Sequence, residues 1–192
     1  MVMYQRHNRQ IWQEPLFVLI GINVLVYLLT LGSPTLLYQL GLSPATFTQE
    51  PWTAVTSMFV HGTFSHVLFN MLALYFFGSY MVQLVGERTM LAIYFIGGIV
   101  GSLFFWLLGP SYAIAVGASG AIFALGGALA VLKPMTRVII FPIPIPMPLW
   151  IAVIGGGLLI SLVPGVAWEA HLGGLITGIG AALLISRGRL RL

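Results

Sequence analysis

Long uncharged stretches are the feature that most restricts how this chain can fold. Eight Lys and Arg and four acidic residues leave uncharged runs at 15–49, 51–86, 89–132, 138–168 and 170–186. A membrane-spanning helix needs about 20 mostly apolar residues, and four of these runs exceed that length. Charged residues make up 6% of the chain, against roughly a quarter in soluble domains. The runs therefore exclude an ordinary soluble domain and predict a chain that crosses a membrane repeatedly.

The number of spans follows from the lengths of the runs. Run 89–132 is long enough for two spans with a break at Gly109-Pro110-Ser111, and each other run holds one. We therefore predict an all-α polytopic membrane protein, a six-helix bundle with helices over 15–32, 64–84, 89–108, 117–132, 149–163 and 169–186. The expected organisation is one membrane domain at 15–186, between an N-terminal segment at 1–14 and a basic tail at 187–192.

The distribution of charge indicates the topology. All eight cations fall on the same side of the six expected spans, and positive residues favour the cytoplasmic side. We therefore expect both termini to be cytoplasmic and loops 34–56, 110–116 and 164–168 to face outward. These cations are spread over the termini and connections on one side of the expected spans. They do not form the clustered basic face typical of nucleic-acid binding, so nucleic acid is not an expected partner. The first apolar run is long and lacks a cleavage signature, which favours a permanent span over a signal peptide.

Two missing residue types restrict the chemistry. The sequence has no Cys and no Asp, which excludes thiolate nucleophiles, disulfides and a paired-aspartate protease. The four His residues do not form the His-Glu-x-x-His zinc motif, so no metal and no cofactor are expected. The remaining candidates are Ser, His, Asn and Glu.

Unusual polar residues occur at one depth of the expected bundle. The second, fourth and sixth helices run in the same direction, and their first turns contain His66, Asn70, Ser119 and His171. Polar residues inside a span are costly and often functional. Small-residue patterns, Gly97-x-x-x-Gly101, Gly120-x-x-x-Ala124 and Gly174-x-x-x-Gly178, favour close approach of the helices that hold them.

A serine nucleophile with a histidine base is the chemistry that fits these residues best. Ser119 in Gly117-Ala118-Ser119-Gly120 would on its own be read as a helix-packing hydroxyl, and a lone His171 as a structural group. Together they form a plausible dyad, because a neutral imidazole can take the serine proton. Glu169 is two residues from His171 and faces elsewhere on a helix, so no triad is expected. Phe123, one turn after Ser119, offers a flat surface for the imidazole.

Acyl transfer also needs hydrogen-bond donors for the oxyanion. His66 and Asn70 are four residues apart, on one helix face, and could act with the backbone N–H of Ser119. The alternative is that both are interhelical hydrogen-bond partners. We expect His61 to brace the external loop.

Three motifs in order resemble the rhomboid family of intramembrane serine proteases over roughly Trp52 to Gly178. They are His61-Gly62-x-x-x-His66-x-x-x-Asn70 with Phe77-Gly78, Gly117-Ala118-Ser119-Gly120, and Ala170-His171-x-x-Gly174-x-x-x-Gly178. The resemblance implies a six-helix core, Ser119 as nucleophile, His171 as base and then acid, and His66 and Asn70 as oxyanion donors. It also implies cleavage of transmembrane protein substrates near the outer leaflet of a prokaryotic inner or plasma membrane.

The chain departs from the family pattern outside these motifs. Thr53 follows Trp52 where Arg is common, Val82 stands where Glu is common, and Phe123 stands where Tyr is common. Two alternative functions stay open: an inert rhomboid-like membrane binding protein and a small transporter. The full set of polar residues at one leaflet favours the protease.

Two connecting segments have unusual composition. Residues 142–148 carry a proline at every second position, which excludes a helix and predicts a stiff extended connector near the cytoplasmic interface. Loop 34–56 is apolar for an external loop, and we expect it to lie in the outer interface.

Overall fold

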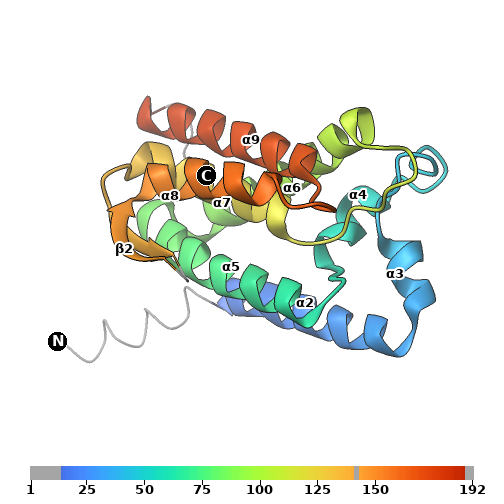
Figure 1. Ribbon diagram of the computed structural model, residues 1–192. Coiled ribbons are helices and arrows are strands. Elements are labelled where there is room, and N and C mark those ends of the chain that lie inside the picture. Colours follow the sequence, from blue (N-terminus) through green and yellow to red (C-terminus); the bar gives the residue numbers. More distant parts are fainter. Residues whose placement is uncertain (1–13, 141–142, 189–192) are drawn as a thin grey trace.

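The computed structural model describes residues 14–140 and 143–188, and every structural statement below refers to them. Figure 1 shows the elements in chain order: α2 (Glu14–Gly32), α3 (Pro34–Leu40), α4 (Thr53–Thr56), the 3-10 helix η1 (Ser57–Phe59), α5 (Phe64–Val85), α6 (Glu87–Leu108), α7 (Ser119–Leu132), β1 (Arg137–Ile140), β2 (Ile143–Pro148), α8 (Leu149–Ser161) and α9 (Trp168–Ser186).

The six predicted helices are all present, and the prediction of an all-α membrane bundle is confirmed. Helices α2, α5, α6 and α9 are long and apolar enough to cross a membrane. Helices α7 and α8 have only 14 and 13 residues, so they rise about 20 Å each. They are therefore shorter than the roughly 30 Å hydrocarbon core, and the six elements are not six equal spans.

Helix α7 lies at the centre of the bundle. It is buried on nearly all sides, and Ala124, Leu125, Ala128 and Leu129 have no exposed surface. Figure 1 shows it between α9 and α6 on one side and α5 on the other. A helix made almost entirely of small and aliphatic residues suits such a position, because it has no polar face to expose.

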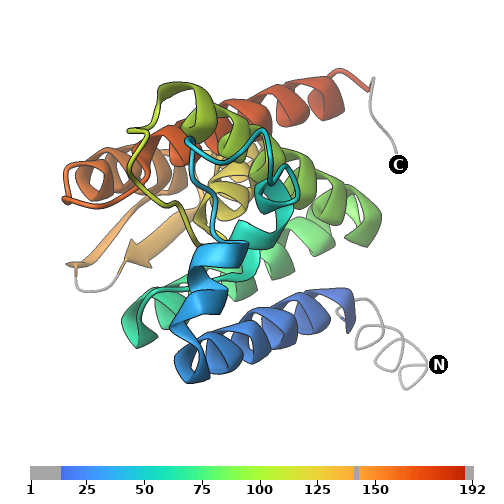
Figure 2. The same cartoon turned by 90° about the vertical axis from the view of Figure 1, so that its right-hand side faces the viewer.

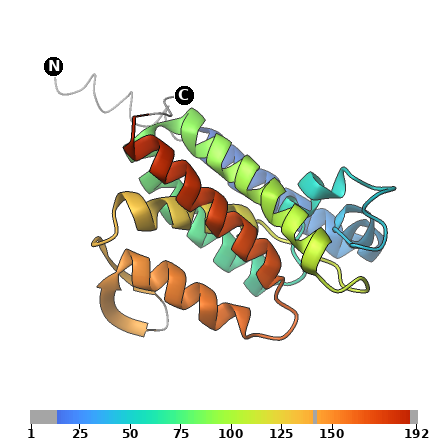
Figure 3. The same cartoon turned by 90° about the horizontal axis from the view of Figure 1, so that it is seen from above.

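Small residues allow α6, α7 and α9 to pack closely, as the three predicted patterns indicated. A Cβ at Gly174 would collide with the carbonyl of Gly120, and one at Gly178 would collide with the carbonyl of Ala124. The backbones of α7 and α9 are therefore in direct contact over two turns. Figure 3 shows α9 beside α6 along much of its length.

Helix α2 packs mainly on α5, at the edge of the bundle, as Figure 2 shows. Leu16 of α2 is fully buried and fills the space that Gly78 of α5 leaves open. The opposite face of α2 exposes Leu25, Leu28 and Leu29 by more than half. An apolar face of this kind on an apolar helix suits contact with lipid tails.

Local signals determine where α5 begins and ends. The hydroxyl of Thr63 accepts a hydrogen bond from the backbone N–H of His66 at 3.1 Å, which caps the helix. Gly86 is the single residue between α5 and α6. Its φ of 84° is a backbone conformation that favours glycine. The cap places His66 in the first turn of α5.

Two connections differ from a simple loop. The external segment 34–56 contains α3 and α4, two short helices that the sequence does not predict. The proline-rich segment is extended, as predicted, over residues 143–148, but it also pairs antiparallel with β1, with Val138 opposite Met147. The predictions for residues 1–13 and 189–192 lie outside the described residues.

Candidate active site

Ser119 is the first residue of α7, where it follows a tight turn of the chain. Gly117 has a φ of 122°, and its backbone N–H donates to the carbonyl of Ser57 at 2.9 Å. The first backbone N–H groups of a helix have no acceptor in the preceding turn. The turn thus holds the Ser119 hydroxyl and its N–H at the open end of the helix.

The hydroxyl of Ser119 lies against the imidazole of His171. The two atoms, Ser119 Oγ and His171 Nε2, are 2.8 Å apart, a normal hydrogen-bond distance. His171 is in the first turn of α9 and is 7% exposed. The close packing of α7 on α9 produces this distance, because the glycines of both helices bring their first turns together.

An aromatic ring supports the imidazole. Phe123 stacks on His171 with 4.3 Å between ring centroids and 24° between planes. Phe123 also lies against Gly157 of α8, where a Cβ would lie 2.7 Å from the Phe123 ring. The sequence reading predicted Phe123 as a flat surface but missed Gly157, for which the run Gly155-Gly156-Gly157 was the only signal.

The second nitrogen of His171 is not held by a carboxylate. Among the described residues, His171 Nδ1 has no hydrogen-bond partner. Glu169 is buried, two residues before His171, and its carboxylate is not among the partners of the ring. Among the described residues, the Ser119–His171 pair is therefore supported by packing on Phe123.

His66 lies directly beside the turn that precedes Ser119. A Cβ at Gly117 would lie 2.7 Å from His66 Nε2 and 3.8 Å from Ser119 Oγ. Gly117 thus provides the space in which the His66 ring approaches the Ser119 hydroxyl. Together with its positive φ, this contact explains why glycine is required at position 117.

Asn70 is buried one turn after His66. Its amide Nδ2 donates to the carbonyl of His66 at 2.9 Å, and its Oδ1 has no partner in the described part of the chain. A carboxamide has two N–H groups, so one remains available after this bond. The structure therefore gives Asn70 a local bond within α5 that the sequence reading did not foresee.

His61 lies between η1 and α5 and is 1% exposed. Its ring packs edge-on against His66 with 4.9 Å between centroids. Burial, together with a smaller effect of the neighbouring His66, lowers the pKa of His61 to about 4. The His61 ring therefore packs on His66, and the expected role of His61 in bracing the external loop stays a prediction.

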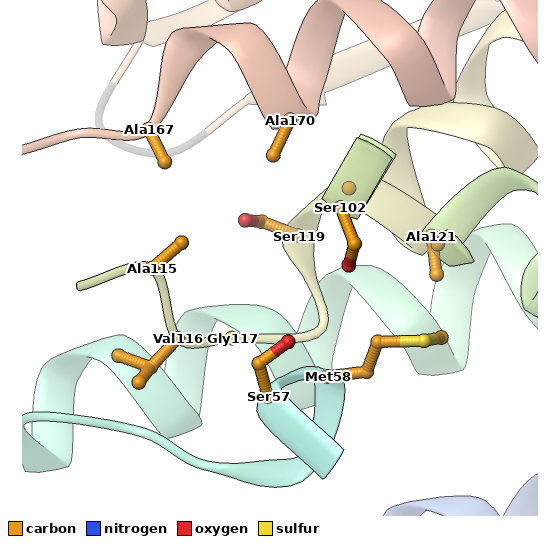
Figure 4. A pocket seen from close by; sticks show the side chains of 12 residues that line it. Ser57, Met58, Ser102, Ala115, Val116, Gly117, Ser119, Ala121, Ala167 and Ala170 are labelled. Carbon is orange, nitrogen blue, oxygen red and sulfur yellow. The ribbon is translucent and has the colours of Figure 1, made fainter. Parts of the chain in front are cut away.

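A small cavity opens beside Ser119, as Figure 4 shows. Its volume is about 20 Å³, which is room for about one water molecule. Residues with small side chains or none make up most of its wall: Ser57, Met58, Gly98, Ser102, Ala115, Val116, Gly117, Ser119, Gly120, Ala121, Ala167 and Ala170. Sequence reasoning missed most of this set because it comes from separate segments that only the fold brings together.

Comparison with known proteins gives a consistent result. Residues 48–188 match the rhomboid domain family. The rhomboid protease AarA of Providencia stuartii is 32% identical over 206 residues, covering 91% of this chain and 73% of that protein. Rhomboid protein 1, mitochondrial, of Saccharomyces cerevisiae is 31% identical over 147 residues, covering 69% of the chain. The putative rhomboid protease YdcA of Bacillus subtilis is 33% identical over 90 residues, covering 47%. The aligned regions cover only 41% and 43% of these last two proteins.

Proposed function

This chain belongs to the rhomboid family, and from that membership we propose that it is an intramembrane serine endopeptidase. The observation that carries the proposal is the 2.8 Å distance between Ser119 Oγ and His171 Nε2. Relatives named as proteases support the reaction class. In this proposal Ser119 is the nucleophile, and His171 is first the general base and then the general acid.

The first half of the reaction forms an acyl-enzyme. The hydroxyl proton of Ser119 moves to Nε2 of His171 while Oγ attacks the carbonyl carbon of the scissile peptide bond. Nε2 must therefore begin unprotonated, with the ring hydrogen on Nδ1. When the tetrahedral intermediate collapses, the C–N bond breaks and the proton passes from Nε2 to the leaving amine. The product that departs carries a new amino terminus.

The second half regenerates the serine. A water molecule gives a proton to Nε2 of His171, and its oxygen attacks the ester carbonyl of the acyl-enzyme. The C–Oγ bond then breaks, and the proton returns to Ser119. The cavity beside Ser119 supports this step, because it has room for about one water molecule.

Three groups are the proposed oxyanion donors. The backbone N–H of Ser119 lies at the N-terminus of α7, where the helix dipole also favours negative charge. His66 approaches the same position beside Gly117. Asn70 has one N–H left after its bond to the His66 carbonyl. His66 and Asn70 must each orient an N–H toward the developing charge for this assignment to hold.

Transmembrane protein segments are the proposed substrates. The dyad lies in the first turns of α7 and α9, which favours cleavage near one leaflet rather than at the centre of the bilayer. The small-residue wall of the cavity favours small side chains next to the scissile bond. With the positive side of the chain in the cytoplasm, that leaflet is the outer one.

Covalent labelling tests the proposed nucleophile separately from any choice of substrate. Purified protein in detergent should react with a fluorophosphonate, and mass spectrometry should locate the adduct on Ser119. Ser119→Ala and His171→Ala should both abolish labelling. The matched control Ser79→Ala, a second serine inside a membrane helix, should label like the unmodified chain. A folded protein that does not react would favour an inert rhomboid-like binding protein instead.

A further inference from the structure

The β-hairpin between α7 and α8 has one face that the bundle does not cover. Val138 packs against the core, and Met147, its partner across the hairpin, is half-buried. Arg137 is exposed, and Ile139 and Ile145 are each 64% exposed. Apolar side chains beside a cation at the end of a membrane bundle suggest contact with something other than water.

A hydrogen bond to α5 indicates how deep the hairpin lies. The hydroxyl groups of Tyr80 and Thr136 are 3.2 Å apart, and Tyr80 is five residues before the last residue of α5. At 1.5 Å per residue, the backbone of Tyr80 lies about 7.5 Å inside the end of that apolar helix, and its hydroxyl contacts Thr136 just before β1. Figure 1 shows β2 at this end of the bundle, next to α8.

Further hydrogen bonds fix the hairpin to α8. The N–H of Leu149 donates to the carbonyl of Thr136 at 2.8 Å, and the N–H of Trp150 donates to that of Pro134 at 3.4 Å. Thr136 is thus bonded to α5 through its side chain and to α8 through its backbone. The hairpin therefore cannot swing into water without breaking contacts with two helices.

The prolines of β2 remove hydrogen-bond donors from its free edge. Successive N–H groups of a strand point to opposite edges, and Pro144, Pro146 and Pro148 have none. The residues between them must therefore supply the donors that face β1, which leaves a free edge without N–H groups. Such an edge protects against strand pairing in water, but it also avoids unsatisfied donors next to lipid. The depth of the hairpin favours the second role.

The charge near the hairpin has one sign. Lys133 and Arg137 are both exposed, and the sequence contains no acidic residue between Glu87 and Glu169. Cations next to exposed apolar residues at a membrane boundary complement anionic phospholipid headgroups.

We infer that the β1–β2 hairpin lies in the membrane interface opposite the Ser119–His171 pair and that Lys133 and Arg137 bind anionic phospholipid headgroups there. Ile139 and Ile145 then lie among the upper acyl chains. The inference concerns the anchoring of α8 and is independent of the proposed protease activity.

Spin labelling tests the depth, and the absence of cysteine makes single-cysteine variants straightforward. Nitroxides on Ile139→Cys and Ile145→Cys are compared in vesicles of phosphatidylcholine and phosphatidylglycerol. Leu72→Cys on the exposed face of α5 is the lipid reference, and Ser111→Cys in the α6–α7 loop is the water reference. Both hairpin labels should be relaxed more by oxygen than by a water-soluble nickel chelate. Labels as open to the chelate as the one at position 111 would overturn the inference.

Headgroup selectivity tests the role of the two cations. A fluorophore on Ile145→Cys is quenched by phosphatidylglycerol or phosphatidylcholine that carries a nitroxide high on its acyl chain. Phosphatidylglycerol should quench several-fold more effectively, since each cation near the surface contributes roughly a fivefold preference. The double variant Lys133→Gln/Arg137→Gln should bring the ratio of the two quenching efficiencies close to one, while Arg88→Gln, in the first turn of α6, should leave that ratio unchanged. Equal quenching by both lipids in the unmodified hairpin would contradict headgroup binding.

Discussion

Ser119 Oγ and His171 Nε2 lie 2.8 Å apart although 52 residues separate them in the chain. The distance results from backbone contact between α7 and α9, where Gly174 faces the carbonyl of Gly120. The pair therefore depends on glycines that take no part in the chemistry themselves.

Gly117→Ala should disable the site while most of the fold survives. The new methyl would lie 2.7 Å from His66 Nε2, and a φ of 122° disfavours alanine, with a cost of about 1–3 kcal/mol. We expect proteolysis to fall at least a hundredfold, measured with purified protein on a labelled transmembrane substrate. Gly62→Ala, where a Cβ meets nothing within 4 Å, is the control. Equal activity of both variants would mean that the His66 contact is unimportant.

Gly157→Ala should affect His171, the proposed general base, indirectly through Phe123. A Cβ there would lie 2.7 Å from the ring of Phe123, which stacks on His171. We expect kcat to fall about tenfold with KM nearly unchanged, because the substitution changes the support of the base. Alanine favours a helix by about 1 kcal/mol over glycine, so α8 itself should not be weakened.

Two controls make this test specific. Gly155→Ala, whose nearest contact would be 3.9 Å away, should leave kcat unchanged. In a Phe123→Ala background, Gly157→Ala should have no further effect on kcat. An undiminished effect in that background would show that Gly157 does not act through Phe123.

Asn70→Ala should lower kcat by about 10²–10³, the usual effect of losing one oxyanion donor. Asn70 also donates to the carbonyl four residues earlier, so some loss of stability is expected. Asn23 makes the same bond to Leu19 at 2.8 Å within α2, and Asn23→Ala is the matched control for that loss. If the two variants lose the same stability and Asn70→Ala retains full kcat, Asn70 is a structural residue only.

Much of this arrangement could be predicted from the sequence. Uncharged runs indicate the helices, and the common direction of three of them indicates that His66, Ser119 and His171 share one depth. The burial of α7 was not predictable, because a helix of small aliphatic residues has no polar face to mark its neighbours. The Gly157–Phe123 contact depends on helix rotation, which residue spacing does not determine. The bond from Asn70 to the His66 carbonyl lies within one helix and depends on the side-chain conformation of Asn70. Alternating prolines exclude a helix over 143–148, but they do not reveal that this segment pairs with β1.

Topology is a separate prediction, since all eight cations fall on one side of the six spans that the sequence predicts. A reporter active only in the cytoplasm should work when it is fused after the last residue. The same reporter inserted in loop 110–116 should be silent while the protein is still inserted. The reverse pattern would place the dyad at the cytoplasmic leaflet.

Cleavage of a labelled single-span polypeptide by the purified protein tests the central claim most directly. The unmodified chain should cut near the leaflet that holds Ser119, and Ser119→Ala and His171→Ala should each abolish cleavage. Because the two residues act as one unit, the double variant should be hardly worse than either single variant. Substantial cleavage by folded Ser119→Ala, at the same peptide bond, would contradict the serine mechanism.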